Sequence, residues 1–270
     1  MHRHERHGQR FFSQEQCAEK SIVMPTINCN SIKEIYWQNT KNAPLELAGE
    51  ILIWRFPASA TFELKKYWHA LLDVEEAEKA SRFRQDKDRQ RFITSRIALK
   101  LLLAKFVAID PSKVRISPGE NKKPYVIHDK QIKLEFNLTH AGDWILIAIA
   151  SVAIGIDMEK IDGMFAFHDI MEFSFLPEEI QFVQNADIPR QQFYTMWTRK
   201  EAMLKATAKG LDDDLRTVPA LDGTHAVSDS ISGPESKWNI TSFEVDKNHP
   251  GSVAYPMSID RLQFFHADAF

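Results

Sequence analysis

Gly155-Ile156-Asp157-Met158-Glu159-Lys160 is the stretch that divides this 270-residue sequence into two halves. Together with Ile154 it has the short apolar pattern of a β-strand, and another strand is expected just before it at Trp144 to Ala150. Side chains two residues apart on a strand point to the same face, so Asp157 and Glu159 present two carboxylates side by side. Adjacent carboxylates repel unless a cation joins them, and hard oxygen ligands suit Mg²⁺ held jointly with substrate phosphates. Taken alone, the stretch also fits a polar strand end with two solvated acids.

A long helix is expected downstream, from about Arg190 to Ala208, with Gly210 as a suitable stop. It contains Trp197, Glu201 and Lys205, which stand four residues apart and therefore share one face. The alternative is an ordinary surface Glu–Lys pair, which contributes only about a few tenths of a kcal/mol. Trp197 on the same stripe favours packed surroundings for the pair.

A third group of polar residues lies upstream, in Phe136-Asn137-Leu138-Thr139-His140 and the turn that follows. The turn from Thr139 to Asp143 joins two predicted strands, and its hydroxyl, imidazole and backbone amides can donate to a phosphate. Lys123-Pro124 forms a rigid turn that presents one more cation. A lone histidine in a turn is more often structural, so this segment does not decide the function by itself.

The rest of the chain predicts mixed α and β structure. Glu50 to Phe56 predicts a strand, Asp73 with Glu76 a helix-capping box, and Phe92 to Phe106 a buried helix. Residues 238–245 and 252–255 predict a late hairpin. Residues 1–46 have weak periodicity and many turn formers, so we treat them as an N-terminal extension, disordered in part, with organised structure starting at Glu50. We place one lobe at 47–152 and the other at 153–270.

Composition excludes several classes of protein. With 44% hydrophobic residues the chain can bury a substantial core, and a net charge of -3 disfavours a general nucleic-acid binder. Cys17 and Cys29 have neither zinc-ligand spacing nor the number of a disulfide scaffold. No apolar run approaches the length of a membrane span. We therefore expect a soluble cytoplasmic protein with no nucleic-acid or membrane partner.

In this order and spacing the three segments resemble the Sfp-type 4'-phosphopantetheinyl transferases. That family has the signatures G-[IV]-D-x-E and [FW]-x-x-K-E-[AS]-x-x-K, which Gly155 to Glu159 and Trp197 to Lys205 match, and an F-N-[IL]-[ST]-H segment like Phe136 to His140. Lys122 departs from the pattern, because the family usually has glycine before the Lys-Pro turn. The resemblance covers about residues 50–211.

The resemblance implies an α+β fold, a pseudo-dimer of two similar lobes with coenzyme A in the cleft between them. It implies a magnesium-dependent transfer of 4'-phosphopantetheine from coenzyme A to a serine of an apo acyl or peptidyl carrier protein, which releases adenosine 3',5'-bisphosphate. A monomer is implied, because the two lobes already form the cleft.

The resemblance also implies roles for individual residues. Asp157, Glu159 and Glu201 would bind Mg²⁺, and Glu201 would also be the general base. Lys205 would hold the pyrophosphate. The 3'-phosphate would be held by Arg91, Lys123 and His140, with a hydroxyl contact from Thr139. Four phenylalanines after the predicted metal strand fit either a docking patch for the carrier or core positions: Phe165, Phe167, Phe173 and Phe175.

Other functions fit less well. Another magnesium-dependent phosphotransferase would share the acids and basic residues, but no P-loop or dinucleotide glycine motif is present. A hydrolase is disfavoured by the lack of a G-x-S-x-G elbow. A non-catalytic coenzyme A sensor, or a scaffold of a synthase complex, would not need Asp157, Glu159, Glu201 and Lys205 together.

Overall fold

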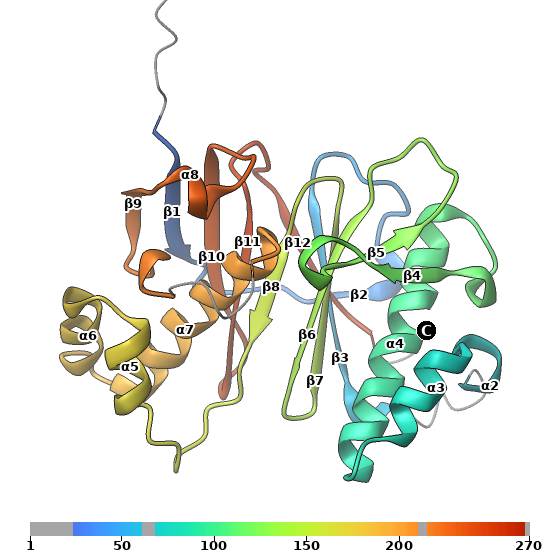
Figure 1. Ribbon diagram of the computed structural model, residues 1–270, viewed down its shortest axis with the longest axis horizontal. Helices are drawn as coiled ribbons and strands as arrows, with labels where there is room; N and C mark the ends of the chain where they lie inside the picture. Colours follow the sequence, from blue (N-terminus) through green and yellow to red (C-terminus); the bar gives the residue numbers. More distant parts are fainter. Residues whose placement is uncertain (1–23, 61–67, 210–214, 268–270) are drawn as a thin grey trace, which may run out of the picture.

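The computed structural model describes residues 24–60, 68–209 and 215–267 of the chain. Gly210, the expected end of the long helix, lies outside these residues. Within them two lobes stand side by side, each built on a five-stranded sheet with helices on its outer face (Figure 1). No helix in the described ranges is long and apolar enough to cross a membrane.

The first lobe has a sheet of strand order β2-β12-β3-β7-β6. In it β7 pairs antiparallel with both β3 and β6, whereas β12 pairs parallel with both β2 and β3. A two-stranded β4-β5 sheet lies beside it. Its elements are β2 (Gln38–Asn39), η1 (Thr40–Asn42), β3 (Ile51–Pro57), η2 (Ala58–Ala60), α2 (Trp68–Leu71), α3 (Val74–Ser81), α4 (Asp86–Val107), η4 (Pro111–Lys113), β4 (Arg115–Pro118), η5 (Glu120–Lys122), β5 (Pro124–Ile127), β6 (Glu135–Ala141), β7 (Trp144–Ala150) and β12 (Leu262–His266).

The second lobe has a sheet of strand order β8-β11-β10-β1-β9. The predicted late hairpin is confirmed as β10 and β11. The elements of this lobe are β1 (Thr26–Ser31), β8 (Gly155–Met158), α5 (His168–Ser174), α6 (Pro177–Gln184), α7 (Pro189–Ala206), η6 (Leu215–Thr217), β9 (Gly223–Ala226), α8 (Asp229–Ser232), β10 (Lys237–Asp246) and β11 (His249–Pro256).

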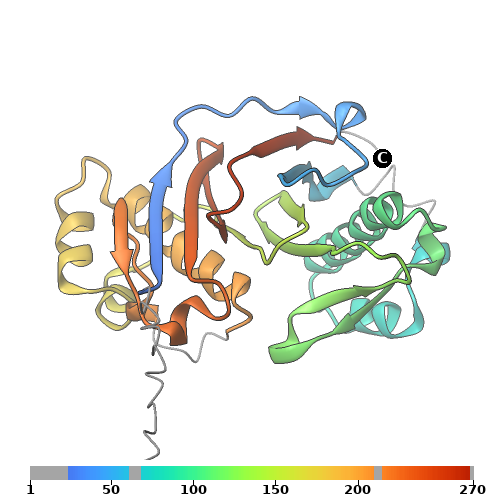
Figure 2. The same cartoon turned by 90° about the horizontal axis from the view of Figure 1, so that it is seen from above.

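Each lobe receives a strand from the far end of the chain. β1 pairs between β10 and β9 in the second sheet, and β12 pairs with β3 in the first, so the chain crosses between the lobes at both ends (Figure 2). The prediction that organised structure starts at Glu50 is therefore wrong for residues 26–31. Only Ile27 and Cys29 of β1 are buried, and two apolar positions among asparagines give too weak an alternation to predict a strand.

The two sheets pack face to face and the long helices cover their outer faces. Ile51 and Ile53 of β3 point into the core between the sheets, whereas Leu52 and Trp54 point to the core beneath α4. In the second lobe, Met203 of α7 packs in the corresponding outer core. The layers are thus helix, sheet, sheet and helix, which confirms the expected α+β pseudo-dimer.

The same buried ion pair occurs in both lobes. Lys100 Nζ on α4 lies 2.5 Å from Glu76 Oε2, and Lys200 Nζ on α7 lies 2.8 Å from Glu179 Oε2. Each glutamate is at the third position of its short helix and also accepts the backbone N–H of the residue before that helix, at 3.1 Å and 2.9 Å. Breaking such a buried pair from one side costs about 3–5 kcal/mol. The pairs fix α3 and α6 to the long helices, although the two halves share no visible sequence repeat.

Candidate active site

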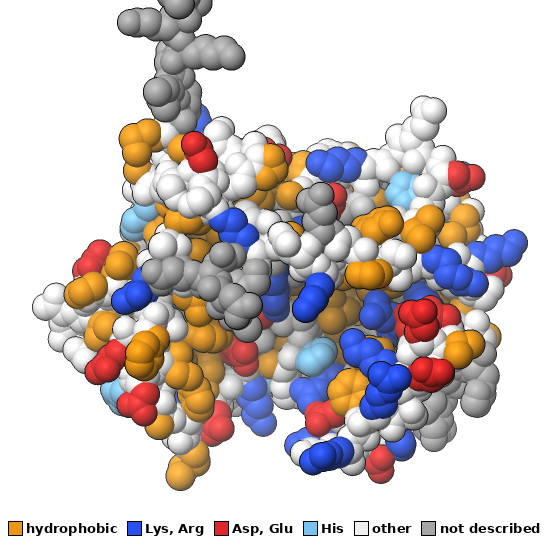
Figure 3. Space-filling model, viewed as in Figure 1, with side chains coloured by type: hydrophobic (Ala, Val, Ile, Leu, Met, Phe, Trp, Pro, Cys, Tyr) orange, Lys and Arg blue, Asp and Glu red, His pale blue; other side chains and the backbone are white. Residues whose placement is uncertain are grey.

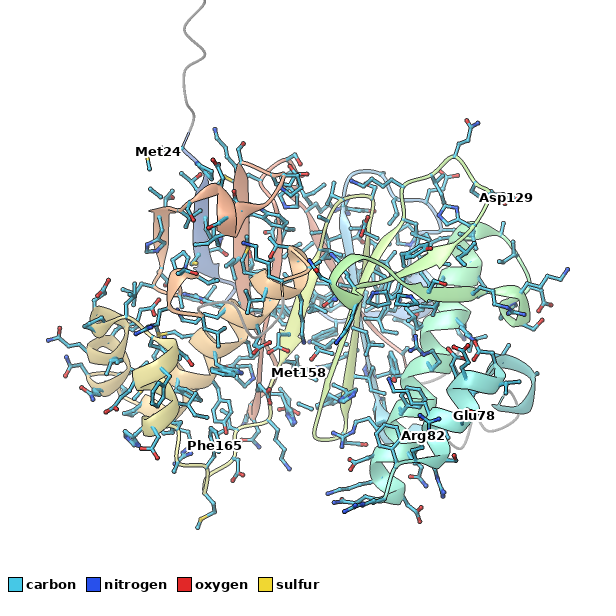
Figure 4. The ribbon with its side chains drawn as sticks, in the orientation of Figure 1. Met24, Glu78, Arg82, Asp129, Met158 and Phe165 are labelled. Carbon is cyan, nitrogen blue, oxygen red and sulfur yellow. The ribbon has the colours of Figure 1, made fainter. Side chains whose placement is uncertain are left out.

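The predicted site residues converge where β6 of the first lobe lies beside β8 of the second. Asn137 Oδ1 accepts the backbone N–H of Ile156 at 2.8 Å, and Thr139 Oγ1 donates to Asp157 Oδ1 at 3.1 Å. These hydrogen bonds join the lobes along the inner edges of both sheets. Met158 marks this boundary, between β8 and the first lobe, in Figure 4.

Gly155 allows α7 to lie directly on β8. A methyl group added to Gly155 would lie 2.0 Å from the carbonyl oxygen of Ala202 and 2.3 Å from the backbone nitrogen of Ala206. No side chain fits there, so the glycine sets the distance between strand and helix. As a result Lys205 on α7 reaches Asp157, and its Nζ lies 2.6 Å from Oδ1.

Three carboxylates share this region. Asp157 is 4% exposed, and its Oδ2 is buried with no hydrogen-bond partner among the described residues. Burial, and then the negative charge of Asp157, raise the pKa of Glu159 to about 7 and the pKa of Glu201 to about 7. Near neutral pH the cluster therefore holds more negative charge than Lys205 alone balances, and a cation would relieve it.

The side chains do not form a ready-made metal cage. In the part of the chain that the structure describes, no three His, Cys, Asp or Glu side chains are close enough together to hold a metal ion. The ammonium of Lys205 already donates a hydrogen bond to Asp157 Oδ1. The donors nevertheless fit Mg²⁺ chemically: they are carboxylate oxygens, one of them buried without a partner, and mutual repulsion disfavours their ionisation.

Arg91 and His140 lie together on the first-lobe side. Arg91 on α4 donates to the carbonyl of Gly142 at 3.3 Å and pairs with Asp88 at 2.5 Å. His140 is exposed near the end of β6, so Thr139 and His140 lie on the strand, and the predicted turn from Thr139 to Asp143 is reduced to Gly142 and Asp143. The pKa of His140 is lowered, first by the partial burial of its ring and then by the positive charge of Arg91. The two residues therefore place a cation and an imidazole beside the Gly142 turn.

Lys123 has a structural role that its sequence position did not suggest. Its Nζ donates to the carbonyls of Ile154 at 3.1 Å and Ala206 at 2.9 Å, so it fixes the β5 turn to the second lobe and to the end of α7. Burial lowers its pKa. Two of its three N–H donors are used in this way. The preceding residue, Lys122, has φ of 65°, a conformation that favours glycine, so the loop keeps the backbone shape of a glycine turn.

A cavity of about 720 Å³ opens beside the carboxylates. Glu159 lines one part of it, and the opposite part is apolar, with Phe165, Phe193 and Trp197. Of the four phenylalanines that fitted either a docking patch or the core, Phe167 and Phe175 are core residues, since both are buried. Phe165 and Phe173 are exposed, by 37% and 77%.

Arg199 and Lys200, which follow Thr198 in the helix motif, have structural roles. Arg199 donates to Ser242 Oγ at 2.7 Å and to the carbonyl of Ala220 at 2.6 Å, and it pairs with Asp222. Lys200 forms the buried pair with Glu179. Their positions, three and four residues after the buried Met196, place them on the apolar stripe of α7. That spacing was the available sequence signal for their burial.

Comparison with known proteins gives a consistent result. A family model described as 4'-phosphopantetheinyl transferase, N-terminal, matches residues 56–152, and one described as 4'-phosphopantetheinyl transferase superfamily matches residues 153–254. The Synechocystis sp. protein slr0495 is 32% identical over 196 residues, which are 71% of this chain and 80% of that protein. A 4'-phosphopantetheinyl transferase of Bacillus subtilis is 30% identical over 201 residues, 72% of this chain and 87% of that protein. The 4'-phosphopantetheinyl transferase Sfp of Bacillus subtilis (strain 168) is 27% identical over 190 residues, 68% and 82% of the two chains.

Two α+β lobes with acids and a lysine at their junction, matched by both family models, place the protein in the phosphopantetheinyl transferase superfamily. Within it, the relatives and the signature segments around Asp157 and Glu201 agree. The chain belongs to the Sfp-type 4'-phosphopantetheinyl transferases.

Proposed function

We propose that this protein transfers 4'-phosphopantetheine from coenzyme A to a serine hydroxyl of an apo carrier protein and releases adenosine 3',5'-bisphosphate. The observation that carries the proposal is the placement of Glu201 and Lys205 on α7 against Asp157 on β8, opposite Arg91 and His140 of the first lobe. The acids with Lys205 suit the phosphoryl group that reacts, and the cationic groups of the first lobe suit a second phosphate on the same substrate.

We assign the proton transfer to Glu201. Before a cation binds, the Glu201 carboxylate has a pKa of about 7 and is a stronger base than an ordinary glutamate. A metal ion bound to it would lower that pKa, so the assignment rests on its place beside Asp157 and Lys205. Glu201 would take the proton of the serine hydroxyl as the oxygen attacks the β-phosphorus of coenzyme A. Lys205 would hold the pyrophosphate charge, and Arg91 and His140 would hold the 3'-phosphate. Lys123 would add one N–H to that phosphate, because its other two donate to carbonyls. Thr139, which donates to Asp157, would orient that carboxylate.

We propose magnesium dependence on the chemistry of the donors. Asp157, Glu159 and Glu201 would hold the ion, and Lys205 would then be free to move from Asp157 to the substrate. When bound, Mg²⁺ would neutralise the charge that develops on the departing adenosine 3',5'-bisphosphate as the pyrophosphate bond breaks.

The carrier would dock across both lobes at the open end of the cleft. Carrier proteins are acidic helical modules, and basic residues crowd the first lobe around the end of α3 and the start of α4, including Arg82, Lys87 and Arg89 (Figure 3). On the other lobe Phe165 and Phe173 are exposed. Arg82 and Phe165 lie at the same end of the molecule on opposite lobes (Figure 4). A basic rim facing an apolar one fits a partner with an acidic helix and an apolar contact face.

The remaining parts of the proposal follow from this reaction. One chain already contains the residues of both sides of the cleft, so we propose a monomer. The lobes divide between residues 152 and 153, apart from the exchanged strands β1 and β12. Because the reaction consumes coenzyme A, we place it in the cytoplasm.

Intact-mass spectrometry of an apo carrier protein tests the reaction. Incubation with this protein, coenzyme A and Mg²⁺ is expected to add one phosphopantetheine, and chelation of the metal is expected to prevent the gain. Glu201→Gln is expected to slow transfer by roughly 100-fold or more, because the base is lost. Glu178→Gln, an exposed acid at the start of α6, is the matched control and should transfer normally.

Wild-type turnover by Glu201→Gln would contradict the assignment of Glu201 as the general base. If several apo carriers gained no mass while calorimetry showed coenzyme A binding, the protein would instead be a non-catalytic sensor or scaffold.

A further inference from the structure

His249, at the start of β11, lies between the two halves of the candidate site. It is 7% exposed. Its Nδ1 lies 2.7 Å from Asp246 Oδ1. Since the pKa of Asp246 is lowered, despite burial, by this hydrogen bond and others, the carboxylate is an acceptor and Nδ1 must donate. The ring is therefore held in one orientation.

The Nε2 and Cε1 edge of the His249 ring packs closely against the turn between β6 and β7. A methyl group added to Gly142 would lie 2.6 Å from His249 Nε2 and 3.4 Å from Cε1. Nε2 is buried and has no hydrogen-bond partner among the residues that the structure describes. The Nε2 edge of His249 therefore acts here through its close packing against Gly142 and not through a hydrogen bond. Gly142 follows His140 closely, and its carbonyl accepts from Arg91.

The backbone around His249 holds the opposite side of the site. The N–H of Glu159 donates to the carbonyl of Pro250 at 3.1 Å, and the N–H of Ile161 donates to the carbonyl of Asn248 at 2.9 Å. The turn between β10 and β11 thus fixes the acidic segment with its main chain and the Gly142 turn with a side chain. These turns lie at the same end of the two sheets (Figure 1).

Asp246 adds a second connection to the first lobe. Its Oδ2 accepts the indole N–H of Trp144 at 2.6 Å, just after the Gly142 turn. Arg55 stacks on this indole, 5.1 Å from the ring centroid, and its guanidinium also donates to the carbonyl of Val245. Asp246 and His249 therefore contact both ends of the turn that carries Gly142.

We propose that His249, oriented by Asp246, is a positioning residue that sets the distance between the phosphate-binding pair Arg91 and His140 and the acidic segment at Glu159. This inference rests on the proposed function, since it assumes that the Arg91–His140 side binds coenzyme A. Loss of the ring frees the Gly142 turn but leaves the backbone bonds of Glu159 intact. Coenzyme A affinity should therefore suffer, whereas the chemical step at saturation should not.

The test compares His249→Ala and His249→Asn with wild type. Asn keeps a donor near Nδ1 for Asp246 but lacks the edge that contacts Gly142. Both variants are expected to raise the dissociation constant for coenzyme A, by calorimetry, and its KM roughly 5- to 20-fold, with kcat within about twofold. His249→Asn should keep the wild-type melting temperature. His225→Ala, at a histidine of β9 bonded to the Leu221 carbonyl, is the control and should change neither constant.

A double-mutant cycle identifies the contact. Gly142→Ala is expected to weaken coenzyme A binding, because its methyl group meets the His249 ring, meets Lys160 Cδ at 3.1 Å and strains a left-handed backbone. His249→Ala removes the first of these contacts, so it should cost less in the Gly142→Ala background than alone. Additive effects, or His249→Asn with wild-type affinity, would overturn the proposal while wild-type transfer stood. If wild type neither bound coenzyme A nor modified a carrier, the proposed function itself would fail.

Discussion

At the scale of single residues, this protein depends on a few positions where backbone shape or close contact admits one kind of side chain. Gly155 and Gly142 are such positions, and each has the residue it needs. Lys122 is an exception. It keeps φ at 65°, in the left-handed region, although a side chain with a Cβ is strained there.

Lys122→Gly should therefore stabilise the protein. The substitution relieves the left-handed strain, and part of the gain is lost because glycine makes the unfolded chain more flexible. We expect a net increase of about 0.5–1 kcal/mol in the free energy of unfolding, measured by urea denaturation. Lys113→Gly, at a helical position of η4, is the comparison and should destabilise. A loss of stability in Lys122→Gly would show that the lysine side chain outweighs the strain.

At the scale of secondary-structure elements, the site depends on the contact between β8 and α7. The strand holds Asp157 and the helix holds Glu201 and Lys205, and Gly155 sets their separation. A change in the spacing between β8 and α7 would move Glu201 and Lys205 together relative to Asp157.

Gly155→Ala tests that dependence. Its methyl group would lie 2.0 Å from the backbone of α7, so the helix must move outward. We expect a loss of stability of about 1–3 kcal/mol or more, and a larger loss of transfer activity than of folded protein. Gly163→Ala is the matched control, because nothing lies within 4 Å of its added methyl group. Wild-type activity in Gly155→Ala would mean that the strand and helix tolerate a wider spacing.

Elements with regular periodicity could be predicted from the sequence. The positions of polar side chains on those elements could be predicted with them. The capping box at Asp73 and Glu76, the strand at Gly155 and the long helix with Lys205 are present as expected. Their signals are local: a cap, an apolar run, a four-residue spacing. The ion pair between Asp157 and Lys205 was not predicted, because Lys205 was expected to hold the pyrophosphate.

Features that depend on distant partners could not be predicted in this way. β1 forms because a gap exists between β10 and β9, which its own residues do not reveal. A second case is the pair of contacts that the Lys123 ammonium makes with carbonyls of the other lobe, which its place in a turn did not indicate. Whether a cation faces a ligand or a carbonyl depends on the tertiary structure, and its position in a turn is compatible with both.

At the scale of the whole molecule, the accumulated acids affect stability and its response to pH. Glu159 and Glu201 have pKa values raised from 4.5 to about 7, so the folded protein binds more protons than the unfolded chain between these pH values. Stability from this source is complete below about pH 4.5 and is lost as the pH rises through 7.

Without added metal, the melting temperature should therefore fall between about pH 5 and 8, by an amount corresponding to roughly 1–3 kcal/mol for the pair. Mg²⁺ should raise it more at pH 8 than at pH 5.5, because it binds the ionised carboxylates. Scanning calorimetry across this range is the measurement. The Glu159→Gln, Glu201→Gln double variant should lose most of both effects, and an unchanged pH slope in that variant would contradict the assignment.

The exchange of strands between the lobes has a consequence for cutting the chain. β1 lies in the second sheet although it precedes the whole first lobe, and β12 lies in the first sheet although it follows the whole second lobe. A nick between residues 152 and 153 would leave two fragments, each missing a strand from its own sheet and carrying one that belongs to the other. Such fragments are complementary halves rather than independent domains, and they would stay interlaced after the covalent link was gone.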